Sequence, residues 1–252
     1  MKNLAPLAVV ALVMVGTPAA ATTLDLTTTT STGTINGGVF TTTDNQSTGT
    51  GVIQSFVRIQ KTGDEEGYNA TARPVMDDVN TSPIFTRDLL LSAVSEVTLG
   101  GLVYYEFLLD INQTNANPLV SLNELQIYTR ATALTTADTL AALTAAPSVL
   151  RYDLDAGAGG DSTVLLDYSK NSGSGSGDLF VYILKSAFGN ETDYVYLYSQ
   201  FGTTGPPYAT NDGFEEWAVR SPSNISVPDG GTSAGLLGLG MLGLGYLRRR
   251  TQ

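Results

Sequence analysis

The strongest constraint on the fold is a series of short segments in which apolar and polar residues alternate. The clearest one covers residues 103–111, where Tyr105, Phe107, Leu109 and Ile111 recur at every second position. This period places alternate side chains on opposite faces of a β-strand. Similar segments follow one another between turns that contain glycine, asparagine and aspartate. The pattern predicts antiparallel strands joined mostly by short turns.

About nine or ten such segments lie within residues 51–221. They cover residues 52–60, 89–91, 97–99, 103–111, 122–128, 149–154, 164–168, 179–184, 194–201 and 214–219. One short helix is expected over residues 136–145, with Thr136 as its N-cap and Pro147 beyond its end. Many short strands with few helical windows predict an all-β fold, an antiparallel β-sandwich of jelly-roll type. A concanavalin-like sandwich is the nearest alternative.

The chain divides into four parts by composition. Residues 1–21 are apolar, residues 22–50 are rich in threonine, residues 51–221 carry the strand pattern, and residues 222–252 form a linker and an apolar tail. The threonine-rich part favours either edge strands at 24–26 and 35–43 or a loosely ordered lead-in. We expect a long polar loop over residues 64–88, which either serves function or wraps the core.

The composition excludes several kinds of chemistry. The chain has no cysteine and no histidine, so it cannot form a disulfide framework, a Ser-His-Asp triad or a zinc site with imidazole or thiolate ligands. A formal net charge of −11 opposes binding to nucleic acid or anionic lipid. Carboxylate chemistry remains, as in glycoside hydrolases or calcium sites, and we expect no enzymatic activity.

Residues 1–21 have the pattern of a signal peptide. Lys2 supplies the positive charge, residues 4–16 are apolar, and Ala19 and Ala21 fit an A-x-A cleavage site. The apolar segment is short and ends at Pro18, which disfavours a permanent anchor. We therefore expect export and cleavage by signal peptidase.

The tail combines three features in a fixed order. These are the motif Val227-Pro228-Asp229-Gly230-Gly231, the apolar residues 234–247, and the cluster Arg248-Arg249-Arg250. The apolar run would extend ~21 Å as a helix, and a bilayer crossing needs about 20 residues. Its glycines weaken a helix further, while the arginines hold the end of the chain on the cytoplasmic side. We expect a temporary transmembrane helix inserted in the inner membrane.

This order of motif, apolar segment and arginine cluster resembles the PEP-CTERM sorting signals that exosortases process in Gram-negative bacteria. Asp229-Gly230 stands where the commonest form has Glu-Pro, so the motif looks like the VPDGG or VPDSG variant. The resemblance implies an exosortase as partner and a surface or extracellular location in an exopolysaccharide-rich biofilm. Residues 51–220 are also similar to a recurrent extracellular domain of exosortase-sorted proteins, for which no activity is implied.

Two groups of aromatic residues are candidates for ligand binding or for the core. Tyr194, Tyr196 and Tyr198 leave the same face of one expected strand and could offer flat rings to sugars. The alternative is that a loop covers them. Trp217, the single tryptophan, alternates with Glu215 and Val219 and is expected in the core.

Calcium is the one cofactor for which the sequence offers ligands. Asp153, Asp155 and Asp161 surround a glycine-rich turn, and a second group contains Asp110, Asn112, Asn123 and Glu124. Calcium accepts irregular shells of carboxylate and carbonyl oxygens, although solvated turn carboxylates explain the same pattern. The acid pairs Glu65-Glu66 and Glu215-Glu216 cannot each flank one glycosidic bond, because neighbours on a strand point to opposite faces.

Three functional hypotheses follow. The first is an exported, exosortase-processed, non-catalytic protein with a structural or adhesive role in an exopolysaccharide matrix. The second is a carbohydrate-binding module that uses the Tyr194 strand. The third is a glycan-active enzyme with an acid pair assembled across strands.

Overall fold

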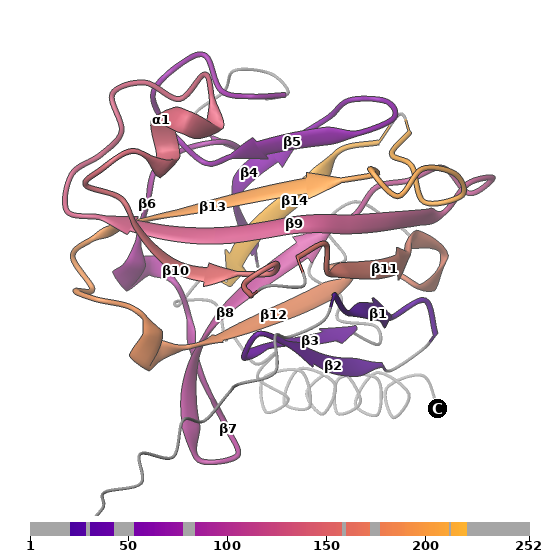
Figure 1. Ribbon diagram of the computed structural model, residues 1–252, viewed down its shortest axis with the longest axis horizontal. Coiled ribbons are helices and arrows are strands. Elements are labelled where there is room, and N and C mark those ends of the chain that lie inside the picture. Colours follow the sequence, from indigo (N-terminus) through magenta and orange to yellow (C-terminus); the bar gives the residue numbers. More distant parts are fainter. Residues whose placement is uncertain are drawn as a thin grey trace, which may run out of the picture.

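The computed structural model describes residues 21–28, 31–42, 53–77, 84–157, 160–171, 177–211 and 213–220. These residues form two β-sheets that pack face to face (Figure 1). The front sheet contains β1 (Thr23–Asp25), β5 (Glu65–Tyr68), β6 (Leu89–Leu90), β9 (Leu119–Arg130), β10 (Val149–Asp153), β11 (Thr163–Asp167) and β13 (Tyr194–Phe201). The back sheet contains β2 (Thr32–Ile35), β3 (Gly38–Thr42), β4 (Ile53–Ile59), β7 (Glu96–Leu99), β8 (Leu102–Asp110), β12 (Leu179–Leu184) and β14 (Glu215–Arg220).

Eight of these strands follow the jelly-roll order. Along the chain they are β4, β5, β8, β9, β11, β12, β13 and β14. The back sheet arranges four of them as β12-β8-β14-β4, and the front sheet arranges the others as β11-β9-β13-β5. The chain therefore passes from one sheet to the other at almost every step, as two interlocked Greek keys require. The predicted all-β, jelly-roll-like sandwich is confirmed.

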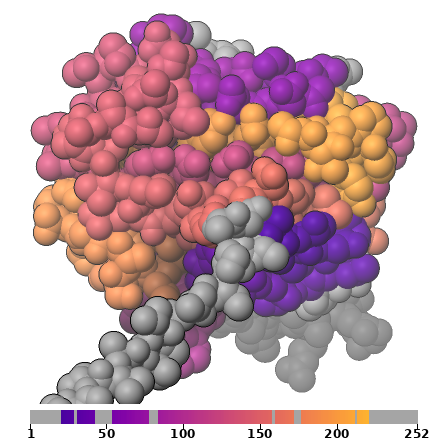
Figure 2. Space-filling view, viewed as in Figure 1, coloured from indigo at the N-terminus to yellow at the C-terminus, as the bar shows by residue number. Residues whose placement is uncertain are grey.

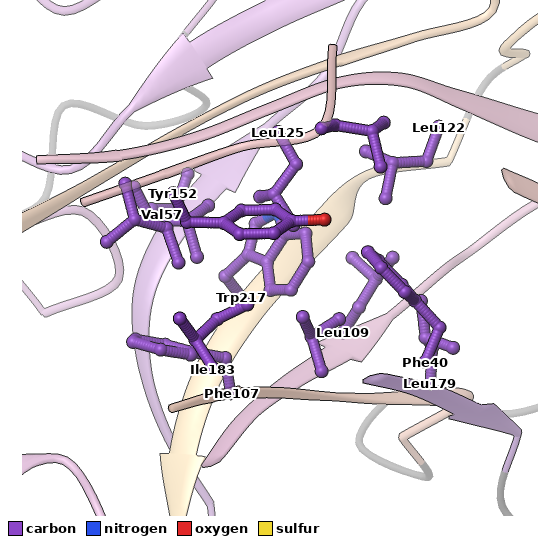
Figure 3. Packing of buried hydrophobic residues seen from close by; sticks show 14 of the residues in the cluster. Phe40, Val57, Phe107, Leu109, Leu122, Leu125, Tyr152, Leu179, Ile183 and Trp217 are labelled. Carbon is purple, nitrogen blue, oxygen red and sulfur yellow. The ribbon is translucent and has the colours of Figure 1, made fainter. Parts of the chain in front are cut away.

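The core lies between the two sheets and collects the alternating apolar residues. Tyr105, Phe107, Leu109 and Ile111 are all buried there, as their period of two predicts. Trp217 on β14 lies among them, and Figure 3 shows its indole ring between side chains from both sheets. Its Nε1 donates a hydrogen bond of 3.0 Å to Ser199 Oγ on β13, so one side chain links the sheets by packing and by a polar contact.

The front sheet gains a strand that the sequence pattern does not predict. β5 lies inside the expected polar loop and pairs with β13, with Gly67 opposite Ser199. A Cβ on Gly67 would lie 2.6 Å from the carbonyl oxygen of Met76, so glycine permits this close approach. The expectation of a strandless loop over residues 64–88 is wrong, because the short β5 has glutamate or glycine at three of its four positions and so lacks an apolar alternation.

The threonine-rich segment also contributes strands. β2 and β3 form a hairpin at the edge of the back sheet, and β3 pairs with β12. β1 pairs with β11 in parallel, with Leu24 opposite Val164. Within the described residues, this part of the chain therefore extends both sheets (Figure 1).

The helix α1 (Leu140–Thr144) is shorter than predicted and begins later. Thr139 is its N-cap, and its Oγ1 accepts a hydrogen bond of 3.3 Å from Ala142 N. The predicted cap, Thr136, is wrong because the neighbouring Ala137 makes a bridge with Val75 and keeps the backbone extended there. Short elements of this kind depend on tertiary contacts more than on propensity.

The position of Trp217 gives a direct test of the core. The Trp217→Ala substitution should lower the free energy of unfolding by about 3–5 kcal/mol, because it leaves a cavity between the sheets and removes the partner of Ser199. Urea denaturation measures this change. Leu102→Ala is the control, since Leu102 is 54% exposed. An equal effect of both substitutions would contradict the assignment of Trp217 to the core.

Candidate functional site

The tyrosines of β13 lie on the outer face of the front sheet, but other segments cover them. Tyr196 is 0% and Tyr198 is 3% exposed, while Tyr194 is partly buried. They belong to a second apolar cluster made of Tyr68, Ala70, Val75, Tyr128, Leu134, Ala137, Leu143, Tyr196 and Tyr198. Figure 2 shows the segment around α1 covering this part of the front sheet. Of the two alternatives for these tyrosines, the structure has the covered one, because two loop segments bury their own side chains against the same apolar face.

The tyrosine hydroxyl groups fasten this cover to the sheet. Tyr196 accepts a hydrogen bond of 2.9 Å from Leu134 N and donates one of 3.0 Å to Asp88. Tyr68 donates to the carbonyl oxygen of Thr139 at 2.9 Å. Burial raises the pKa of the Tyr68 hydroxyl to about 12. These groups act as neutral hydrogen-bonding anchors for the cover.

Farther along the outer face of the front sheet lies a polar cleft of about 290 Å³. Its lining comes from β9, from the turn between β10 and β11, and from the end of β13 and the turn that follows: Asn123, Glu124, Asp155, Asp161, Thr163, Gln200, Thr203 and Thr204. From the sequence, Asn123 and Glu124 are expected in a different group from Asp155 and Asp161. The structure brings these four residues together because β9 lies beside β10 and β11. We call this feature the acidic cleft.

Two carboxyl groups of the acidic cleft contact each other directly. Glu124 and Asp155 form a side-chain hydrogen bond, which requires that one of them carry a proton. Burial and the neighbouring Asp155 raise the pKa of Glu124 to about 7. Burial also raises the pKa of Asp155. Near neutral pH the pair therefore gains or loses one proton.

The other oxygens of this loop stabilise its backbone. Asp153 Oδ1 accepts a hydrogen bond of 2.9 Å from Asp155 N, and Asp155 Oδ1 accepts one of 2.5 Å from Ser162 N. Asp161 has a positive φ of 55°, which an aspartate adopts in a tight turn. Turn formation thus accounts for much of the acidic pattern at residues 153–161.

The remaining predicted calcium ligands lie elsewhere. Asp110 is opposite Glu216 in the back sheet and is 1% exposed. Asn112 follows β8, and its carbonyl oxygen lies against Gly213, where a Cβ would be only 1.0 Å away. Across the described ranges, no group of three or more Asp, Glu, His or Cys residues is arranged to hold a metal ion. Calcium binding at the Asp155–Asp161 turn stays a prediction.

A second acidic pair is buried between the sheets. Glu65 on β5 and Glu215 on β14 are 1% and 0% exposed and lie in side-chain hydrogen-bonding contact. Burial, and then Glu215, raise the pKa of Glu65 to about 11. Burial also raises the pKa of Glu215. In the sequence each glutamate stands beside another acid, Glu66 or Glu216, and the alternation with Trp217 already places Glu215 on the inward face.

The chain neighbours of these glutamates point the other way, as the strand period predicts. Glu66 accepts a hydrogen bond from the hydroxyl of Tyr198 on the outer face of the front sheet. Glu216 accepts a hydrogen bond of 2.6 Å from Arg58 Nε on the outer face of the back sheet. Glu65 and Glu215 therefore form an acid pair that is assembled across strands, and both residues are buried.

Of the predicted processing sites, Ala21 is exposed at the start of the described residues. The others lie outside the described residues: Ala19 at the N-terminal end, and Val227, Pro228, Asp229, Gly230, Gly231, Arg248, Arg249 and Arg250 in the tail. Among the residues that are described, no helix is long and apolar enough to cross a membrane.

Comparison with known protein families settles the nature of the tail. Residues 226–251 match the model of the VPDSG-CTERM motif, with Gly230 in place of the motif's serine. The chain carries a PEP-CTERM-type C-terminal sorting signal. This signal supports export toward the cell surface, and signals of this type are in general processed by exosortases. No curated protein and no solved structure gives a significant match to the chain.

The proton shared in the acidic cleft gives a prediction on pH dependence. A raised pKa of Glu124 in the fold means that the proton stabilises the fold at low pH and that this contribution is lost as pH rises from the ordinary value of 4.5 to about 7. Asp155→Asn should lower the pKa of Glu124, since it removes the neighbouring charge while keeping an acceptor for Ser162 N. Side-chain carboxyl NMR titration measures the shift.

The control for this titration is Asp161→Asn, because the charge of Asp161 raises the pKa of Glu124 less than the charge of Asp155 does. A pKa of Glu124 that stays at about 7 in Asp155→Asn would contradict a shared proton in the cleft.

Proposed function

We propose that this chain is a non-catalytic structural or adhesive component of an exopolysaccharide-rich extracellular matrix. A signal peptide starts its export, and the apolar tail holds it briefly in the inner membrane. An exosortase then cuts near Pro228-Asp229 and frees the sandwich. The observation that carries the proposal is the sorting signal at residues 226–251, which lies C-terminal to the last strand of the described fold, Glu215–Arg220.

The composition of the chain is compatible with an extracellular location. A net charge of −11 keeps a protein soluble and opposes binding to nucleic acid or anionic lipid. The chain has no cysteine, so its stability does not depend on the redox state of its surroundings. Buried apolar surface between two sheets and under a covering layer supplies the stability instead.

The geometry of the acid pairs supports a non-catalytic role. Glycosidases place a sugar between two carboxyl groups that lie about 5–5.5 Å apart in retaining enzymes and farther apart in inverting ones. Glu124 and Asp155 are in hydrogen-bonding contact, which leaves no room for a glycosidic bond between them. Glu65 and Glu215 are also in hydrogen-bonding contact, and both are buried.

A carbohydrate-binding role is the second candidate, and the acidic cleft favours it over the covered tyrosines. Amide, hydroxyl and carboxyl groups line the cleft, and such groups bind sugar hydroxyls. Gln200 of β13 and Thr204 of the following turn both line it together with Asp161. A ligand here would be a neutral or cationic sugar, because the surrounding carboxylates repel uronic acids.

The sorting signal predicts the effect of two tail variants in the native host. Replacing Arg248, Arg249 and Arg250 with serine should leave full-length protein uncleaved, because the positive charges that hold the tail across the membrane are lost. Replacing Pro228 and Asp229 with alanine should block cleavage within the motif. Immunoblotting of membrane and extracellular fractions measures the two forms.

The matched control replaces the same three arginines with lysine, which keeps the positive charges at the end of the tail. It should be processed as the wild type is. Normal processing of both tail variants would refute the proposed sorting route.

The second candidate predicts weaker binding to the producer's exopolysaccharide for Gln200→Ala than for the wild type in affinity electrophoresis. We expect a loss of several-fold for one removed hydrogen-bonding group. Thr98→Ala on the β7 strand is the control. Equal retardation of all three proteins would exclude the cleft as the binding surface.

A further inference from the structure

The side chains of Glu65 and Glu215 meet between the two sheets, and not every oxygen of this pair has a hydrogen-bond donor. One oxygen of Glu65 accepts a hydrogen bond of 2.8 Å from Lys61 N. One oxygen of Glu215 accepts a hydrogen bond from the side-chain amide of Gln113. The remaining oxygens, Glu65 Oε1 and Glu215 Oε2, are buried without a donor. Two ionised carboxylates cannot face each other in this way away from water.

Among the residues that the structure describes, the charged groups around the pair do not supply a counter-charge. On the β5 side, the ammonium group of Lys61 lies 3.4 Å from Asp77 and is half exposed. Asp77 adds negative charge toward Glu65. On the other side, Asp178 precedes β12 and is buried, and both its burial and the charge of Glu215 raise its pKa. Arg58, the cation on the neighbouring strand, is engaged by Glu216 on the outer face.

A single proton fits the position between the two oxygens. It converts one carboxylate into a donor, so that Glu65 and Glu215 form one charge-assisted hydrogen bond from β5 of the front sheet to β14 of the back sheet. The resulting chain of contacts runs from Lys61 N through both carboxyl groups to Gln113. Every oxygen of the pair then has a partner.

We propose that a proton shared by Glu65 and Glu215 fastens the two sheets together at this end of the sandwich, and that alkaline pH releases this fastening. The adjoining loops depend on it. Gly63 and Thr210 exchange two backbone hydrogen bonds of 3.0 and 3.1 Å next to β5, and Thr210 Oγ1 donates to the carbonyl oxygen of Lys61 at 2.7 Å. Loss of the proton therefore loosens residues 61–65 and the loop before β14 together.

The Glu65→Gln substitution tests the proposal, because a glutamine amide donates to Glu215 at every pH, as the protonated Glu65 does. One proton bound in the fold and released on unfolding lowers the folded-to-unfolded ratio by about tenfold for each pH unit above the unfolded pKa. Between about pH 5 and about pH 8, the folded-to-unfolded ratio of the Glu65→Gln variant should therefore fall about tenfold less per pH unit than that of the wild type. Urea unfolding midpoints and slopes across this range measure the difference.

Glu66→Gln is the matched control, with the same chemical change on the next residue and the opposite face of β5. It should keep the pH dependence of the wild type. Glu215→Gln is the reciprocal variant and should flatten the dependence as Glu65→Gln does.

Three outcomes would overturn the proposal. The first is a wild-type pH dependence in Glu65→Gln. The second is failure of both glutamine variants to fold at about pH 5, where the amide imitates the protonated pair. The third is a melting temperature that rises with Ca²⁺ and falls with chelator in the wild type but not in Glu65→Gln, since a metal ion and not a proton would then lie between the carboxylates.

Discussion

Burial of two apolar sheet faces against each other is the interaction on which the rest of this structure depends. The chain has no cysteine, so no covalent link holds the sheets. Residues from both sheets meet around Trp217, and the hydrogen bond from its indole to Ser199 fixes β14 against β13. The jelly-roll order distributes this core over strands that are distant in sequence. Packing against the core therefore determines where each loop, cleft and acidic pair lies.

Both faces of the front sheet are used for burial, and this shapes the surface that remains. Where the segment around α1 covers the tyrosines of β13, the outer face becomes a second apolar layer fastened by hydroxyl groups. Where the cover ends, β9 and the turn before β11 leave the acidic cleft open. Within the described part of the chain, polar groups suited to a ligand thus gather beside the covered tyrosines instead of on them.

Local pattern predicted the strands well and the contacts between distant segments poorly. The period of two over residues 103–111 and the alternation around Trp217 gave the all-β sandwich and its buried face, because side-chain direction in a strand follows from backbone geometry alone. β5 was missed because two glutamates and a glycine hide its pattern, and one of those glutamates points into the core. The covered tyrosines and the pairing of Glu65 with Glu215 depend on which segments fold over which strands, and a single sequence does not carry that information.

The sorting signal at residues 226–251 supports export toward the cell surface. We propose that the tail stays in the membrane only until it is cleaved. Intact mass spectrometry of the protein made by its native host tests this most directly. The account predicts a mature chain that begins after Ala21 and ends near Pro228-Asp229, without the apolar residues 234–247. Abundant peptides that still join Leu247 to Arg248, from a host with a working exosortase, would contradict it.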